Sequence, residues 1–163
     1  MANPESTAIF PEAARGTVTQ VAAAATLRPS AGIRIEAQTT FNRITRSQDG
    51  TLFARTIIPR LKIEYQPTRA LFFRVVGEYI SEVRSDLVDP RTGNQILING
   101  TPATGGERND FRVDLLASYE PTPGTVAFLG YGSSLTSDQT LGFSDLRRMS
   151  DGFFVKLAYQ FRR

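Results

Sequence analysis

Residues 153–163 read FFVKLAYQFRR, and this stretch decides the fold. Side chains of a β-strand point alternately to opposite faces. One face of such a strand is apolar and carries Phe153, Val155, Leu157, Tyr159 and Phe161. The other face is mixed and carries Lys156. The stretch therefore predicts a two-faced strand at the C-terminus, and the other strands should repeat its pattern.

Six earlier stretches show a related pattern. They are predicted as strands over residues 17–27, 33–42, 52–65, 71–82, 110–120 and 126–135. Pro59, inside one of them, indicates a bulge or an unpaired amide because proline cannot donate to a ladder. Residues 1–16 show no period and are expected to be an irregular leader, which leaves 17–163 as the β-domain. The predicted fold is an all-β, antiparallel up-and-down meander of about seven strands.

Three of the connections repeat one motif. Each has an apolar or aromatic residue, a polar residue, proline, and then Ser or Thr, as in the sequences LRPS, YQPT and YEPT that begin at Leu27, Tyr65 and Tyr119. Proline fixes φ for a tight turn. The remaining connections are longer and polar. Tight turns at one end and long loops at the other are typical of an outer-membrane β-barrel.

Aromatic side chains strengthen this interpretation. Tyr65, Tyr119, Tyr159 and Phe161 fall near the tight-turn ends of the apolar faces, where an aromatic girdle meets a membrane interface. We therefore expect a transmembrane β-barrel, small or part of a larger one, in the bacterial outer membrane with the lipid bilayer as partner. The alternative is a soluble β-barrel that encloses a small apolar ligand.

Composition excludes several functions. The chain has 163 residues, a formal charge of +3, and no cysteine, histidine or tryptophan. Thiolate and imidazole metal sites and histidine- or cysteine-based catalysis are therefore excluded. Basic residues are not gathered into one stretch, so no nucleic-acid partner is expected. No cofactor and no enzymatic activity are predicted.

The charged residues of the strands would face the barrel lumen. The predicted lining is Arg34, Glu36, Arg60, Lys62, Glu64, Arg74, Glu78, Arg112, Asp114 and Lys156. Such a lining can select solutes, or it can consist of cross-strand ion pairs that stabilise a polar interior; we favour the ion pairs. Glu64 and Glu78 raise a weaker alternative, a hydrolase-associated barrel with two carboxylates.

Three segments carry a resemblance to a known family. ARTIIPRLKIEYQPTRALFFRVVGEY, RVDLLASYEPTPGTVAFLGYG and DGFFVKLAYQFRR resemble the last strands of a family of Gram-negative outer-membrane proteins. That family joins an N-terminal carbohydrate-binding family-nine-like module to a C-terminal barrel. The resemblance implies a passive role in transport, pore formation or anchoring of a surface domain. No residue here matches the module, so sugar binding is not carried over.

The strand count adds an expectation about assembly. Seven strands are odd, whereas bacterial single-chain barrels have even numbers. With the last strand descending to the periplasmic side, the first must begin outside, as in the C-terminal segment of a larger barrel. Expected partners are thus upstream barrel strands or an oligomer, together with the barrel-insertion machinery, which would recognise the C-terminal strand. Arg162 and Arg163 depart from the usual aromatic end.

Overall fold

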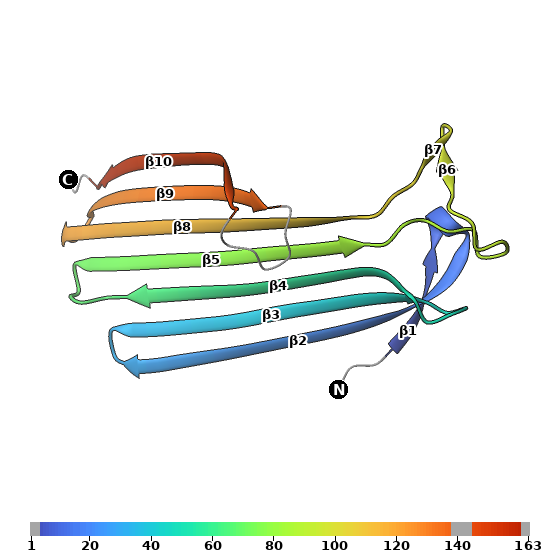
Figure 1. The fold of residues 1–163 in the computed structure, drawn as a ribbon. Helices are drawn as coiled ribbons and strands as arrows, with labels where there is room; N and C mark the ends of the chain where they lie inside the picture. Colours follow the sequence, from blue (N-terminus) through green and yellow to red (C-terminus); the bar gives the residue numbers. More distant parts are fainter. Residues whose placement is uncertain (1–3, 138–144, 161–163) are drawn as a thin grey trace.

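The computed structural model describes residues 4–137 and 145–160. The described residues form an all-β protein (Figure 1). The long strands are β2 (Ala14–Ser30), β3 (Ile33–Arg46), β4 (Leu52–Tyr65), β5 (Leu71–Arg84), β8 (Gly106–Thr122), β9 (Thr125–Ser137) and β10 (Arg147–Tyr159). The short elements are β1 (Pro4–Ile9), the 3₁₀ helix η1 (Phe10–Glu12), β6 (Leu97–Ile98) and β7 (Thr101–Pro102).

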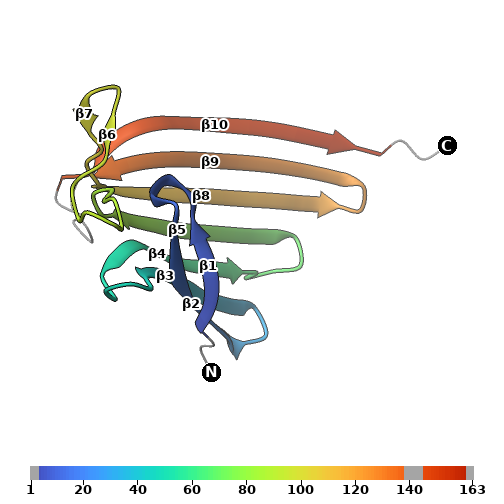
Figure 2. The ribbon, with the colours of Figure 1, turned by 90° about the vertical axis from the view of Figure 1, so that its right-hand side faces the viewer.

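The long strands form one antiparallel, up-and-down sheet. Its order is β1-β2-β3-β4-β5-β8-β9-β10, so each strand pairs with its neighbour in the chain apart from the small β6–β7 hairpin. Figures 1 and 2 show a single layer. The three tight turns, at residues 31–32, 66–70 and 123–124, lie at one end, which we call the tight-turn end; Pro29 and Pro121 of the sequence motifs lie in the last residues of β2 and β8. The connections 47–51 and 85–105 lie at the opposite end, which we call the loop end.

The predicted meander is confirmed, with differences at its beginning and end. Residues 4–9, expected to be irregular, form β1 and pair with residues 14–19 of β2. The period of two is hard to recognise there because Pro4–Ile9 is short and mostly polar. At the other end, β10 begins at Arg147, six residues before the predicted start, after which its register shifts between Arg148 and Ser150.

Pro59 interrupts the ladder between β4 and β5 without shifting its register. The β4–β5 pairing runs from Ile57 opposite Ser81 to Arg60 opposite Glu78, with no pair at the two positions between them. The alignment of the two strands is the same on both sides of the gap. The predicted unpaired position is confirmed, and there is no bulge, because the missing amide breaks a hydrogen bond but adds no residue.

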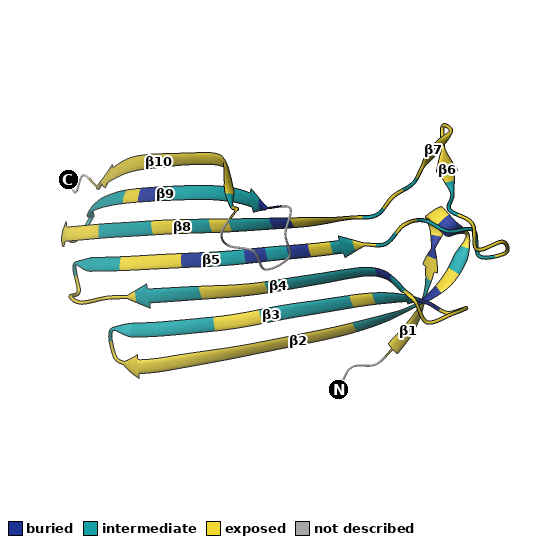
Figure 3. Cartoon of the chain, in the orientation of Figure 1, coloured by how far each residue is buried: buried dark blue, intermediate teal, exposed yellow. Residues whose placement is uncertain are grey.

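Both edges of the sheet are open in the described residues. There, β10 pairs with β9 alone and β1 with β2 alone, and no ladder joins the two edges. Figure 3 shows that β10 is exposed along its whole length, whereas buried positions occur on β5, on β9 and at the loop end. The sheet thus presents two broad faces and two free edges.

Candidate functional site: two faces of one sheet

One face of the sheet carries the charges. Residues that are directly opposite in neighbouring strands share a face. Arg34 is opposite Glu64, and Glu64 is opposite Arg74. By the same ladders, the charged face holds all ten predicted lining residues: Arg34, Glu36, Arg60, Lys62, Glu64, Arg74, Glu78, Arg112, Asp114 and Lys156.

Opposite charges alternate along this face. Lys62 Nζ lies 2.9 Å from Glu36 Oε2 and 3.1 Å from Glu64 Oε1. Arg34 also pairs with Glu36. Arg60 Nε lies 3.9 Å from Glu78 Oε2. The charged face is therefore a network of cross-strand and same-strand ion pairs over β3, β4 and β5. Cross-strand ion pairs were one of the two alternatives that the sequence offered for these residues.

The charged face changes character toward β10. Asp114 is opposite Gly132, and Gly132 is opposite Gly152. Beside them the Phe154 ring lies over Gly130, in the space where a β-carbon would be. An aromatic ring over a strand glycine compensates for the missing side chain. The β9–β10 part of this face therefore combines glycines with the Phe154 ring and carries fewer charges than the part over β3, β4 and β5.

The reverse face is apolar and exposed. It carries most of the large apolar side chains that solvent reaches: Val21, Leu27, Leu61, Tyr65, Phe73, Val75, Leu115, Tyr119, Leu129, Phe153, Val155, Leu157 and Tyr159. Their exposure runs from 37% at Phe73 to 79% at Phe153. The paired side chains of Lys62 and Glu64 are only 25% and 22% exposed. Lys62 and Glu64 are thus better covered than these apolar side chains, whereas Arg34 and Arg60 are 43% and 41% exposed.

The predicted girdle tyrosines form a slanted row on the apolar face. Tyr65 is directly opposite Phe73. We call a line of directly opposite residues across the sheet a rung, and the rung of Tyr65 ends at Val155 on β10. Tyr119 lies on the next rung toward the tight-turn end, which reaches β10 at Leu157. Tyr159 lies one rung further, opposite Thr125. Phe161 lies outside the described residues.

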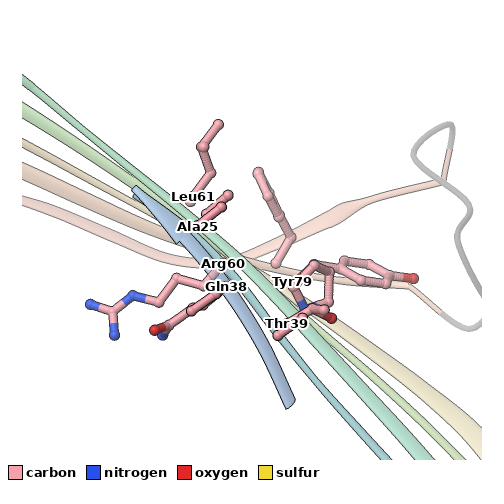
Figure 4. Close-up of a pocket in the computed structure, with 12 residues that line it drawn as sticks. Ala25, Gln38, Thr39, Arg60, Leu61 and Tyr79 are labelled. Atoms are coloured by element: carbon pink, nitrogen blue, oxygen red, sulfur yellow. The ribbon is translucent and has the colours of Figure 1, made fainter. Parts of the chain in front are cut away.

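A shallow hollow interrupts the apolar face near its middle. It has a volume of about 620 Å³ and is lined mainly by small residues, among them Ala23, Ala25 and Ala37. Figure 4 shows Leu61 and Ala25 on one side of the sheet, with Arg60 and Gln38 on the other. The hollow extends to β2, the strand next to the edge strand β1.

A buried ion pair connects three segments at the loop end, and the sequence did not predict it. Arg46 donates from Nη2 to Glu12 Oε1 at 2.6 Å and from Nε to Glu12 Oε2 at 2.8 Å. Glu12 Oε1 also accepts from the Val88 amide at 3.0 Å, and Arg46 donates to the carbonyl of Asp86 at 2.7 Å. The pair joins η1, the end of β3 and the 85–105 loop. No sequence signal marks it because its partners are 34 residues apart.

Hydrogen bonds set the charge state at this end. Burial acts to raise the pKa of Glu12, but the hydrogen bonds from Arg46 and from the Val88 amide outweigh it and hold that pKa below its ordinary value. In the adjoining 47–51 turn, the backbone amide and then the hydroxyl of Thr51 lower the pKa of Asp49. Both carboxylates are therefore ionised at neutral pH.

The two carboxylates of the hydrolase alternative, Glu64 and Glu78, contact different cations. Glu64 bonds to Lys62 and faces Arg74, while the nearest cation to Glu78 is Arg60. Each carboxylate thus has its own cations. Within residues 4–137 and 145–160, no three acidic side chains gather as metal ligands. No helix in these same ranges has the length and apolar character to cross a membrane.

The chain was compared with protein-family models, with curated proteins and with solved structures, and none of the three comparisons gives a match.

Proposed function

We propose that this chain forms part of the wall of a bacterial outer-membrane β-barrel, with the apolar face toward lipid and the charged face toward a polar lumen. Its role is passive: transport, pore formation or anchoring of a surface domain. No active site is part of the proposal. Supporting it are the exposed apolar face, the sidedness of the loops and the slanted tyrosine row.

The tyrosine row carries the most weight because it predicts a strand tilt. From Tyr65 to Tyr159 the row moves four residues along the strands while crossing from β4 to β10. At about 3.4 Å per residue and about 4.8 Å per strand, a row at constant height requires a tilt of about 35°. Transmembrane barrels have strand tilts of roughly 35–45°. A girdle at one membrane interface therefore accounts for the slant.

The opposite boundary of the apolar face slants in the same direction. It begins at Ile57 on β4 and ends at Phe153 on β10. Because Phe153 is on the rung of Ile63, the boundary moves along the strands by the distance from Ile57 to Ile63 while it crosses from β4 to β10. The same spacings give a tilt of about 45°. Along β4 the apolar face extends from Ile57 to Tyr65, about 27 Å, or about 22 Å in height at the lower tilt. That height approaches the roughly 25 Å apolar band of outer-membrane barrels.

The soluble alternative requires the opposite arrangement. A water-soluble barrel turns its apolar face to the core and its charges to solvent. Here Lys62 and its partners Glu36 and Glu64 are no more than 29% exposed, while many apolar side chains of the reverse face are 37% exposed or more. Exposed apolar patches of this extent mark a surface with a partner, and a lipid bilayer covers such a band without specific contacts.

A matched pair of cysteine variants tests the proposal. Val75 and Val76 are neighbours on β5 and lie on the apolar and charged faces. The chain has no native cysteine, so each variant carries a single thiol. The chain is reconstituted in liposomes and labelled with an environment-sensitive fluorophore. We expect brominated lipid to quench the label on Val75→Cys several-fold more strongly than that on Val76→Cys, with water-soluble iodide giving the reverse order.

Two outcomes would contradict the proposal. Equal quenching of both labels by lipid would show that the sheet has no lipid-facing side. A chain that stays monomeric in buffer without detergent, with the Val75→Cys label shielded from iodide, would support the soluble barrel. Osmotic swelling of the same liposomes in sugar or salt solutions then separates a pore from an anchor.

A further inference from the structure

Three phenylalanines interrupt the charged face near the tight-turn end. Phe72, Phe128 and Phe154 lie on this face by the ladders that join β5, β8, β9 and β10. Contact with lipid would account for the large apolar side chains of the reverse face, but these three lie on the side of the ion pairs. A barrel interior is polar, so a role in the wall does not by itself explain them.

The three rings belong to a compact group that also contains two cations. One rung has Arg74 at one end and Phe154 at the other. The next rung of this face, toward the tight-turn end, has Phe72 and Lys156 at its ends. The apolar side chains thus lie between cations at two diagonal corners. We call this group the aromatic–cation patch, and it consists of Phe72, Arg74, Leu116, Phe128, Phe154 and Lys156.

The ring of Phe154 forms the floor of the patch. It lies over Gly130, where a β-carbon would be, because the glycine leaves room for a ring against the backbone. Gly130 is buried, whereas Phe154 remains 54% exposed. Phe72, Leu116 and Phe128 around it are half-buried. An aromatic ring that is covered on the sheet side and open on the other is a surface on which an apolar group can pack.

The charges of the patch have one sign. Arg74 and Lys156 are exposed, and within residues 4–137 and 145–160 neither takes part in an ion pair. The patch contains no carboxylate, and Glu64 on its β4 border already lies 3.1 Å from Lys62. From the strand spacings, the Cα atom of Gly130 lies roughly 8 Å from that of Lys156 and roughly 10 Å from that of Arg74. Both long side chains therefore extend beside the ring floor.

We propose that the aromatic–cation patch binds an amphipathic anion, a molecule with an apolar ring or short chain and a carboxylate. The apolar body packs on Phe154, and the carboxylate accepts hydrogen bonds from the Lys156 ammonium or the Arg74 guanidinium. Ligand sites commonly combine a mostly apolar lining with a few polar groups, and rings of Lys and Arg line pores for anions. The binding itself does not require a membrane, but its role as recognition of a transported solute rests on the proposed barrel function.

The chemistry of the patch discriminates against other solutes. A cation of the same shape would meet two like charges and no carboxylate, and a small inorganic anion would leave the rings uncovered. The part of this face around Arg112 is different, because Glu78 is directly opposite Arg112 and Asp114 lies beside it on the same strand. Charge of both signs there gives no preference for an anion. Selectivity is therefore expected from the aromatic–cation patch and not from the charged face as a whole.

Two probes of equal shape and opposite charge test the proposal, namely phenylbutyrate and phenylbutylamine. Binding to the full chain in non-ionic detergent micelles is measured by equilibrium dialysis, and the uptake by protein-free micelles is subtracted. We expect the acid to bind about threefold or more tightly than the amine, as one or two exposed charge contacts allow. The preference should shrink as salt is added. No binding of the acid, or equal binding of both probes, would overturn the proposal.

A pair of double variants locates the charges. Arg74→Gln combined with Lys156→Gln removes both cations of the patch. Arg108→Gln combined with Arg112→Gln removes the same charge nearer the loop end of the same face. We expect the first double variant to weaken phenylbutyrate binding by about threefold or more and the second to change it by less than about twofold. Equal effects would overturn the proposal, since they would show attraction by the net charge of the chain.

A pair of single variants locates the apolar floor. Phe154→Ala removes the ring of the patch, and Phe153→Ala removes the neighbouring ring on the opposite face. Only Phe154→Ala should weaken binding of both probes, because the ring contacts the part that they share. Equal weakening by the two variants would overturn the proposal. The double charge variants alter exposed side chains alone, so they still decide the matter if Phe154→Ala does not fold.

The membrane function is tested separately on the same chain by lipid quenching of the Val75→Cys label. Binding of phenylbutyrate together with lipid quenching would support both proposals. Binding without lipid quenching would reject the membrane wall and retain the patch as a binding site. Lipid quenching without binding would reject the patch alone.

Discussion

The two ends of the sheet differ in the polar groups that they bury. The loop end buries polar groups: the Glu12–Arg46 pair, and Asn109, which accepts a hydrogen bond from Tyr79 at 3.0 Å. The tight-turn end exposes apolar groups, among them Tyr119 and Leu157. In a water-soluble domain, burial would follow hydrophobicity at both ends. In the proposed barrel, the tight-turn end would face lipid and the buried polar groups would hold the loops at the end that faces water.

The largest effect is expected from breaking the buried pair. Glu12→Ala leaves the Arg46 side chain, 10% exposed, without its carboxylate partner. An uncompensated buried charge typically costs about 3–5 kcal/mol. We therefore expect the thermal midpoint in detergent to fall and the 85–105 loop to become sensitive to protease.

The matched control is Arg108→Ala. Arg108 pairs with Asp110 at 2.9 Å, but its side chain is 73% exposed. Exposed pairs contribute about 0–1 kcal/mol, so this variant should barely change either measurement. Similar losses in the two variants would show that burial does not distinguish the loop end.

A charge on the apolar face tests the other side of the comparison. Leu61 lies in the middle of the apolar part of β4, where an arginine should cost about 2–4 kcal/mol in a membrane barrel. Tyr119 lies at the tight-turn boundary, where the cost should be about 0–1 kcal/mol. Unfolding of Leu61→Arg and Tyr119→Arg from liposomes by urea measures both. Equal costs would mean that no depth-dependent lipid environment covers this face.

Packing on the charged face gives a smaller effect. A methyl group at Gly130 would overlap the Phe154 ring, whereas nothing lies within 4 Å of the corresponding position at Gly152. Overpacking typically costs about 1–3 kcal/mol. We expect Gly130→Ala to lower the urea midpoint and Gly152→Ala to leave it nearly unchanged. If both variants unfold alike, the ring does not cover Gly130.

Acid should destabilise the loop end, and this is the smallest of the effects predicted. The folded-state pKa of Glu12 lies below its ordinary value. Its contribution to stability is therefore complete above the unfolded carboxyl pKa, about 4.3, and is lost as pH falls through the folded value. The loss is smaller than in Glu12→Ala because the protonated acid still fills the site. Thermal midpoints measured from pH 3 to pH 7 should fall less steeply in acid for Glu12→Gln than for the unmodified chain. Parallel plots of midpoint against pH for the two chains would contradict this.

Local patterns predicted the strands and their faces well. The alternation of Ile63 and Tyr65 with Lys62 and Glu64 determines which side chains share a face, because a strand has a period of two. The proline motifs located the three tight turns for an equally local reason. Residues 52–65 were predicted with the bounds that β4 has in the structure. Short, non-periodic elements such as β1 and the β6–β7 hairpin gave no comparable signal.

The loop-end contacts lay beyond such reasoning. Glu12 and the amide of Val88 are separated by 76 residues, and no local rule relates a glutamate in an unpatterned leader to an amide in a long loop. Asn99 and Gly100 both take positive φ in the turn between β6 and β7, but no local pattern predicted these two short strands. Contacts of this kind depend on how the loops pack once the sheet has formed.

The sequence by itself determined that Tyr65, Tyr119 and Tyr159 lie on the apolar face near the tight turns. Only the tertiary structure decided that they form a slanted row, because the row depends on the register of four neighbouring ladders. The physical reason is that the direction of a side chain is set within its own strand, whereas height and pairing are set between strands.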